Sequence, residues 1–145
     1  MDEVLDGRLF VGSVDAAGSE GRLDEAGITH IRNAAYGVPC LFPDKFKYLS
    51  VPALDRQDFD IMPYVKSCLT FYYEATGEGR RSNVLVHCTA GVSRSGAIAV
   101  AIIMHSHHLS YDEALSLAQK RRACLQPNPG FAVQLRTWWL NGMKI

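Results

Sequence analysis

The fold of this chain follows from one stretch, Asn83–Gly96, whose sequence is N-V-L-V-H-C-T-A-G-V-S-R-S-G. Its first part, Val84–Val86, is short, apolar and rich in β-branched residues, which predicts a buried strand. The apolar run Ala97–Met104 is too long for a typical strand and favours a buried helix. The loop between them, residues 88–94, therefore lies where backbone N–H groups and a helix start attract an anion.

Several side chains make this loop chemically reactive. Cys88 opens it, and a cysteine beside converging N–H dipoles has its pKa lowered, to roughly 3.5–7.5 in such sites. Arg94 closes it, and a planar guanidinium binds two oxygens of one phosphate at once. Gly91 permits a turn that a Cβ would hinder. We expect Ser95 to form a hydrogen bond with the Cys88 sulfur, and His87 to hold the loop from behind.

The pattern H-C-x-x-G-x-x-R-S in this stretch resembles the signature of the cysteine-dependent protein phosphatases. The sequence H-C-T-A-G-V-S-R-S-G is most similar to the dual-specificity branch of that family. The resemblance implies a single α/β domain over residues 1–145, with a central, mostly parallel sheet of four or five strands flanked by helices. It also implies that the substrate phosphate is bound by Thr89, Ala90, Gly91, Val92, Ser93 and Arg94.

Two other kinds of site fit the stretch less well. Gly91 to Gly96 has the G-x-x-x-x-G spacing of a nucleotide-binding loop, but Ala97-Ile98 replaces the required Lys-Ser/Thr. The sequence contains no C-x-x-C pair, so we predict no metal site, and the expected chemistry needs no cofactor. The remaining alternative is a buried structural cysteine with an incidental arginine.

The composition indicates an ordinary soluble protein that forms one domain. Of its 145 residues, 48% are hydrophobic and 21% are charged. Lys+Arg and Asp+Glu both number 15, so the zero net charge favours neither nucleic acid nor a membrane as partner. The cysteines at positions 40, 68, 88 and 124 do not suggest a disulfide framework and predict a reducing cytoplasm or nucleus. The sequence shows no signal peptide and no apolar run of about 20 residues.

Strands and helices are expected to alternate along the chain before three helices end it. Strands are expected at residues 9–12 (after a turn at Asp6-Gly7), 28–34, 46–53 and 84–86. Helices are expected within residues 16–26, from residue 61 to an end at Gly77 and Gly79, over residues 97–104, after a capping box at Ser110–Glu113, and from Pro129. The reactive loop then lies at the carboxyl end of its strand, where such sheets place ligands.

The resemblance places a general acid in the loop ahead of the helix that begins near residue 61. Three carboxylic acids compete for this role. Asp60 is expected to be occupied as the N-cap of that helix, whereas Asp58 is eligible on composition alone. The family pattern D-x-x-x-F-[DN] matches Asp55 as the acid, and we therefore predict Asp55.

The resemblance continues near the C-terminus, where Pro127–Phe131 matches the family segment P-N-x-G-F. Asn128 is expected to cap the last helix, and the family suggests that it also braces the loop. Arg121 and Arg122 end the preceding helix. Two interpretations of these arginines stay open. One of them contacts a second phosphate or acidic residues of a substrate, or both lie at an ordinary solvated helix end.

The resemblance implies hydrolysis of phosphotyrosine and phosphoserine or phosphothreonine in proteins, through a cysteinyl phosphate. An alternative is an RNA 5′-triphosphatase, since related members of that class carry the signature H-C-T-x-G-x-N-R-x-G. Thr89 and Gly96 match this signature, but Ser93 stands where it has asparagine. A lipid phosphatase is expected to carry lysines in the loop, where Ala90 and Val92 are uncharged. A phosphoprotein-binding scaffold usually lacks the cysteine, the arginine or the acid, and all three are present here. The oligomeric state is left open.

Overall fold

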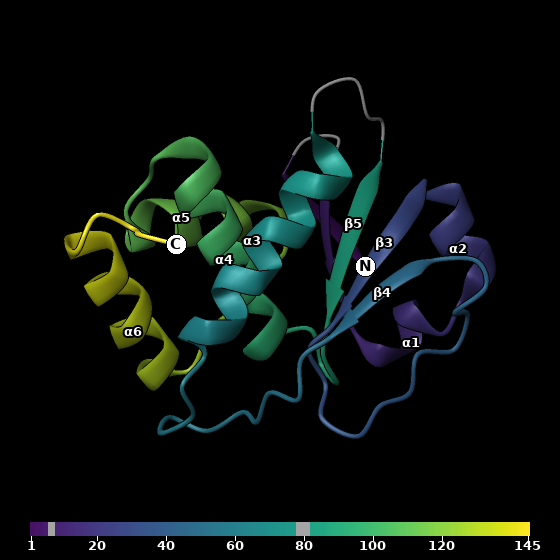
Figure 1. Cartoon of the computed structure of the whole chain (residues 1–145), viewed down its shortest axis with the longest axis horizontal. Helices are drawn as coiled ribbons and strands as arrows, with labels where there is room; N and C mark the ends of the chain where they lie inside the picture. The colour runs from purple at the N-terminus through teal and green to yellow at the C-terminus, as the bar shows by residue number, and fades with distance from the viewer. Residues whose placement is uncertain (6–7, 78–81) are drawn as a thin grey trace.

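The computed structural model describes residues 1–5, 8–77 and 82–145, and its strands form one five-stranded sheet (Figure 1). The strands are β1 Asp2–Leu5, β2 Leu9–Gly12, β3 Ile28–Asn33, β4 Lys47–Ser50 and β5 Asn83–His87. The helices are α1 Val14–Ala17, α2 Glu20–Glu25, α3 Met62–Thr76, α4 Arg94–His107, α5 Tyr111–Arg121 and α6 Pro129–Leu140. The strand order is β1-β2-β5-β3-β4, and only the β1–β2 pairing is antiparallel. The predicted α/β fold with a mostly parallel sheet is confirmed.

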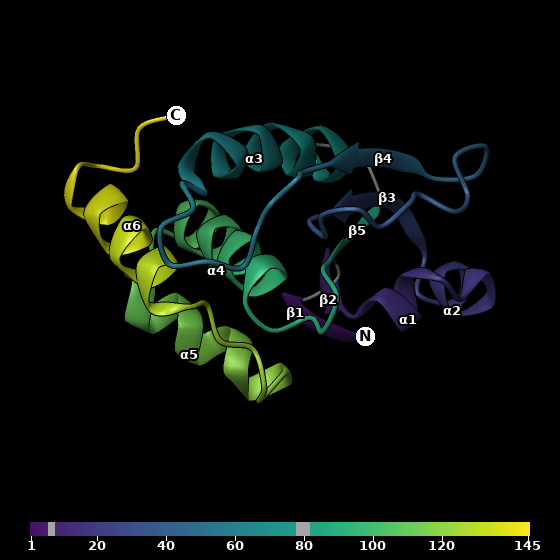
Figure 2. The same cartoon turned by 90° about the horizontal axis from the view of Figure 1, so that it is seen from below.

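Helices cover both faces of the sheet (Figures 1 and 2). Helices α3 to α6 gather on one side, and the short helices α1 and α2 lie on the other. On β5, Val84 and Val86 belong to the larger apolar core, which includes side chains of α3 and α4, while Leu85 belongs to the smaller core beside α2. Because both faces of β5 are covered, every position of its apolar run is buried.

Helix α4 is the central helix of the larger core. Every residue from Ser95 to Met104 is buried, which confirms the buried helix predicted from the apolar run. The helix contacts β2 and β5 as well as α3, α5 and α6. Since Arg94 is its first residue, the reactive loop leads directly from the centre of the sheet into the centre of the core.

Strand β4 covers Lys47–Ser50 and is shorter than the strand expected over residues 46–53. Two further details differ from the expectation. Strand β1 was not predicted, because Val4 is its one fully buried residue and two of its other residues are acidic. Asp60 is not the N-cap of α3, which is Ile61; instead, the Asp60 carboxylate accepts a hydrogen bond of 3.1 Å from Met62 N–H. Asp60 lies one residue before the N-cap, and its carboxylate still binds an N–H group of the first turn that has no partner within the helix.

Two parts of the predicted chain path cannot be compared. Helix α3 ends at Gly77, as expected, but Gly79 lies outside the described residues. The predicted turn at Asp6-Gly7 also lies outside them.

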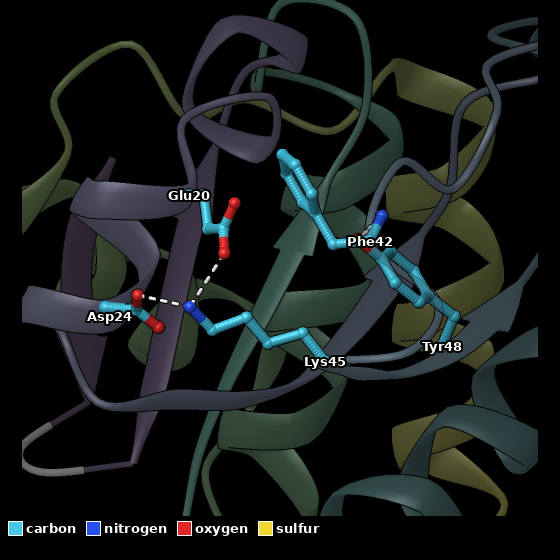
Figure 3. Close-up of polar contacts among 5 residues, drawn as sticks. All are labelled: Glu20, Asp24, Phe42, Lys45 and Tyr48. Carbon is cyan, nitrogen blue, oxygen red and sulfur yellow. Dashed lines mark hydrogen bonds and ion pairs between the residues drawn. The ribbon is translucent and has the colours of Figure 1, made fainter.

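The connection between β3 and β4, a stretch in which no strand or helix was expected, is held by polar contacts (Figure 3). The Lys45 ammonium contacts Glu20 and Asp24 of α2, and the Tyr48 hydroxyl accepts a hydrogen bond of 3.2 Å from Phe42 N–H. Exposed ion pairs of this kind contribute little to stability. Their effect here is to hold the connection against α2, on the side of the sheet opposite α4.

Within the part of the chain that the structure describes, no helix is both long enough and apolar enough to cross a bilayer.

Candidate active site

The reactive loop lies at the carboxyl ends of the central parallel strands, at the lower edge of Figure 1. Two neighbouring segments hold its base. Val14 N–H donates to Thr89 C=O over 3.1 Å, and Ala34 N–H donates to His87 C=O over 2.8 Å. On the far side, Gln126 N–H donates to Val92 C=O over 2.9 Å. The loop is thereby fixed at both ends before any ligand arrives.

The Cys88 sulfur is the centre of the loop. The side chain is 2% exposed, and its Sγ lies 3.1 Å from Ser95 Oγ and 3.3 Å from Gly91 N. Burial acts to raise the pKa of Cys88, but hydrogen bonds from Ser95, Val92 and Gly91 outweigh it, so that the pKa is lowered. The arrangement thus favours a thiolate and provides donors for an anion that approaches it.

Cys68 shows what burial does to a thiol outside the amide and hydroxyl donors of the reactive loop. Burial raises the pKa of Cys68 to about 12, although the neighbouring Arg32 opposes the rise. Cys68 therefore stays a thiol at neutral pH and has no nucleophilic character. All four cysteines, Cys40 and Cys124 included, are free, and of the two buried ones only Cys88 has a lowered pKa.

Arg94 is held at the mouth of the loop by contacts on both arms of its guanidinium. Its Nη1 donates to Ala53 C=O over 3.2 Å, and its Nη2 donates to Thr89 Oγ1 over 3.0 Å. Ala53 lies just ahead of residues 54–61, the segment that carries the three candidate acids, so Arg94 connects that segment to the reactive loop. The two contacts orient the planar group, which otherwise would have several rotamers of similar energy.

Arg122 binds the backbone of the reactive loop, a role that was not predicted from the sequence. Its Nε and Nη2 donate to the carbonyls of Gly91 and Ala90 over 2.9 and 3.2 Å, and its Nη1 pairs with Asp2 at 2.7 Å. In a trans peptide the N–H points opposite to the C=O. The carbonyls that Arg122 binds share their peptide units with the N–H groups of Gly91 and Val92, which donate to Cys88.

The backbone of the loop passes very close to its surroundings at Gly91. This residue has φ +71°, and a Cβ there would lie 2.6 Å from Arg122 Nη2 and 2.7 Å from the Gly12 backbone. A larger residue would both strain the turn and push the loop away from Arg122. Glycine is therefore required at position 91 both for its positive φ and for the close approach of Arg122 and Gly12.

We predict that Arg122→Met weakens the cradle without removing any atom that touches substrate. The N–H groups of Gly91 and Val92 lose their fixed direction, so the pKa of Cys88 should rise and kcat/KM should fall by about ten- to a hundredfold. The acidic limb of the pH–rate profile then moves to higher pH, because thiolate forms later. Alkylation of Cys88 measured against pH checks the shift. Lys120→Met removes an exposed cation in the last turn of α5, just before Arg122, and should change neither measurement.

The three candidate acids occupy different environments. Asp55 Oδ1 accepts a hydrogen bond of 3.0 Å from Asn128 Nδ2, which ties it to the start of α6. Asp58 pairs with Arg56 at 2.9 Å, and both side chains are well exposed. Asp60 binds the first turn of α3. Of the three, Asp55 is the acid that a residue from the other side of the site holds in place.

Asn128 connects the reactive loop, the acid and the last helix. Its side-chain oxygen accepts from Phe131 N–H over 2.9 Å, which confirms the predicted cap of α6. Its backbone N–H donates to Ser93 Oγ over 2.9 Å, and its Nδ2 binds Asp55.

His87 is buried behind the loop, where burial lowers its pKa to about 4, so that the ring is neutral at neutral pH.

A thiol of lowered pKa, amide donors directed at it and a guanidinium fixed at the rim together form a site for phosphoryl transfer to sulfur. Comparison with known proteins agrees with that class. The family described as dual specificity phosphatase, catalytic domain, matches residues 9–140. The chain therefore belongs to the dual specificity phosphatase family.

Individual relatives show how far the likeness extends. Dual specificity protein phosphatase 19 of Mus musculus is 41% identical over 90% of this chain, and the chain spans 58% of that protein. Dual specificity protein phosphatase 1B of Arabidopsis thaliana is 37% identical over 94% of this chain, and 80% of it is covered. The human tyrosine phosphatase-like serine/threonine/tyrosine-interacting protein is 31% identical with a TM-score of 0.90, over 99% of this chain and 98% of that one.

Proposed function

We propose that this protein hydrolyses phosphate monoesters of phosphotyrosine and of phosphoserine or phosphothreonine in proteins, through a cysteinyl phosphate. One observation carries the proposal: amide and hydroxyl donors converge on the Cys88 sulfur and lower its pKa despite its burial. The N–H groups among these donors become available to bind the equatorial oxygens of a phosphate once the sulfur attacks. Membership of the dual specificity phosphatase family supports the substrate class.

In the first step, the Cys88 thiolate attacks phosphorus, the S–P bond forms and the P–O bond to the substrate side chain breaks. Arg94 and the loop N–H groups stabilise the equatorial oxygens as charge is redistributed. The leaving oxygen takes a proton from Asp55. In the second step, a water molecule gives a proton back to Asp55 and attacks phosphorus. The S–P bond breaks, inorganic phosphate leaves, and a hydrogen bond from the Ser95 hydroxyl stabilises the returning thiolate.

We predict that Asp55→Ala acts according to the basicity of the leaving oxygen. A phosphothreonine ester leaves as a basic alkoxide, so its kcat should fall by about 10²–10⁴-fold, the range of general acid catalysis. An activated aryl phosphate leaves as a stable anion and should lose much less. The acidic limb of the pH–rate profile, which follows ionisation of Cys88, should persist in this variant. The measurement is rate against leaving-group pKa.

The matched control for this experiment is Asp58→Ala, which removes an exposed acid of the same loop. It should leave the leaving-group dependence as in the wild type. If Asp55→Ala kept the wild-type slope, or if Asp58→Ala steepened it, the general acid would be another residue.

A second candidate function is binding of phosphoproteins with weak turnover. The observation that favours it is the close structural match to a human protein described as phosphatase-like and interacting. A side-by-side assay on phosphotyrosine peptides, phosphothreonine peptides and RNA 5′-triphosphate separates the functions. We expect turnover of both peptides and none of the RNA. Peptides that bind and are recovered intact would favour the scaffold, and release of phosphate from the RNA would favour the triphosphatase alternative.

A further inference from the structure

Helix α6 lies beside the acid loop, the segment of residues 54–61 that connects the sheet to α3 (Figures 1 and 2). The two segments meet at three places along the loop. At its start, Asp55 is bound by Asn128. The other two contacts involve residues of α6 that the proposed chemistry does not use, Gly130 and Gln134.

Gln134 binds the end of the acid loop with both atoms of its carboxamide. Its Nε2 donates to Phe59 C=O over 2.8 Å, and its Oε1 accepts from Ile61 N–H over 2.9 Å. The two backbone groups lie on either side of Asp60. A carboxamide that supplies one donor and one acceptor to a backbone fixes both the position and the direction of that backbone. The side chain is half-buried, which shields these hydrogen bonds from water.

Gly130 brings the middle of the acid loop against the first turn of α6. A Cβ on Gly130 would lie 2.6 Å from the Cα and the carbonyl carbon of Gln57 and would overlap the carbonyl oxygen. Backbone atoms cannot rotate away as the end of a flexible side chain can. A side chain at this position would therefore force the loop and the helix apart.

These contacts follow the loop from one end to the other. Asn128 contacts Asp55, and Gly130 lies against Gln57. Gln134 contacts both Phe59 and Ile61. Other hydrogen bonds of the loop are short in range, such as Arg56 N–H to Leu54 C=O at 2.9 Å and Phe59 N–H to Arg56 C=O at 3.1 Å. Short-range bonds shape the loop, but they do not determine where it lies relative to the Cys88 sulfur.

We propose that Gln134 is a positioning residue for the general acid, and that α6 serves as the platform on which the acid loop is held. The inference rests on the proposed role of Asp55. Gln134 fixes the end of the loop, the absence of a side chain at Gly130 permits the close approach, and Asn128 orients the carboxylate itself. Loss of the clamp lets the Asp55 carboxyl drift from the leaving oxygen, and a displacement of about 1 Å can lower a rate by about 10²-fold.

The first test replaces Gln134 with methionine, which has a similar length and no strong donor or acceptor. We expect kcat for a phosphothreonine peptide to fall by about tenfold or more, and kcat for an activated aryl phosphate to stay within about twofold. KM for both should change little, since no contact with substrate is lost. The control is Val133→Ala, an exposed neighbour on α6, which should leave both rates unchanged.

The second test is Gly130→Ala, which displaces the loop by steric overlap and leaves Gln134 in place. It should produce the same selective loss on the phosphothreonine peptide. Thermal unfolding is measured for both variants, because a purely structural defect lowers the melting temperature and reduces both substrates equally. An equal loss on the two substrates, in either variant, would overturn the proposal.

A double-mutant cycle separates this inference from the function on which it rests. If Gln134 acts through the acid, Gln134→Met should have almost no further effect on kcat in an Asp55→Ala background. If it lowers kcat by the same factor in both backgrounds, Gln134 does not act through Asp55 and the inference is wrong. If Asp55→Ala alone leaves the leaving-group dependence unchanged, the assignment of the acid fails first.

Discussion

Cys88→Ser is expected to abolish turnover, with a loss on the order of 10⁴–10⁶-fold, the scale seen when the nucleophile of a covalent mechanism is removed. The donors lower the pKa of the Cys88 thiol and so favour the thiolate, whereas a serine hydroxyl is a far weaker acid and stays protonated in the same place. The cradle itself keeps its N–H groups and Arg94. Binding of inorganic phosphate should therefore survive, and equilibrium binding measured beside turnover shows whether the two properties separate.

The control is Cys124→Ser, which changes an exposed cysteine and should retain full activity. Cys68 is a poor alternative nucleophile, because its pKa of about 12 keeps it protonated over the whole working range of pH. Substantial metal-independent turnover by Cys88→Ser would show that Cys88 is not the nucleophile. It would leave the fold and the family unaffected.

Arg94→Lys is expected to lower kcat by about 10²–10³-fold, the range for losing a donor aimed at transition-state charge. Lysine keeps the positive charge but has no planar fork, so it cannot bind two oxygens at once. It also cannot reproduce the paired contacts to Ala53 and Thr89 that orient the guanidinium. KM should change much less than kcat, because the clamp matters most as charge is redistributed.

The matched control is Arg136→Lys, an exposed arginine of α6 that pairs with Asp112. It should turn over at the wild-type rate. If Arg94→Lys did so as well, bidentate binding would be the wrong account of this residue, and charge alone would suffice. Determining kcat and KM for both variants on one phosphopeptide distinguishes the two accounts.

Local patterns predicted several features because their physical causes are local. The capping box at Ser110 and Glu113 forms as expected, since a cap depends only on residues three apart in the chain. Asn128 caps α6 for the same reason. The cap of α3 was misplaced from Ile61 to Asp60, because a carboxylate can reach the same N–H group from either of two positions.

Strand β1 illustrates what local patterns miss. It has the composition of a surface segment, and it forms a strand because β2 offers an edge to pair with. Its Asp2 then becomes the partner of Arg122, which no pattern within either segment indicates. Arg122 itself was expected at a solvated helix end or against substrate, but it lies behind the reactive loop instead.

The sequence by itself determined the reactive loop, the strand that leads into it and the buried helix that follows. These parts are contiguous between Asn83 and Met104, so chain connectivity brings the cysteine, the N–H groups and the arginine together. The tertiary structure alone decided which residues support them. Asp55 meets Asn128 across 73 positions, Gln134 meets Phe59 across 75, and Arg122 meets Gly91 across 31. Such contacts depend on how α5 and α6 pack on the finished core, and no local periodicity encodes that packing.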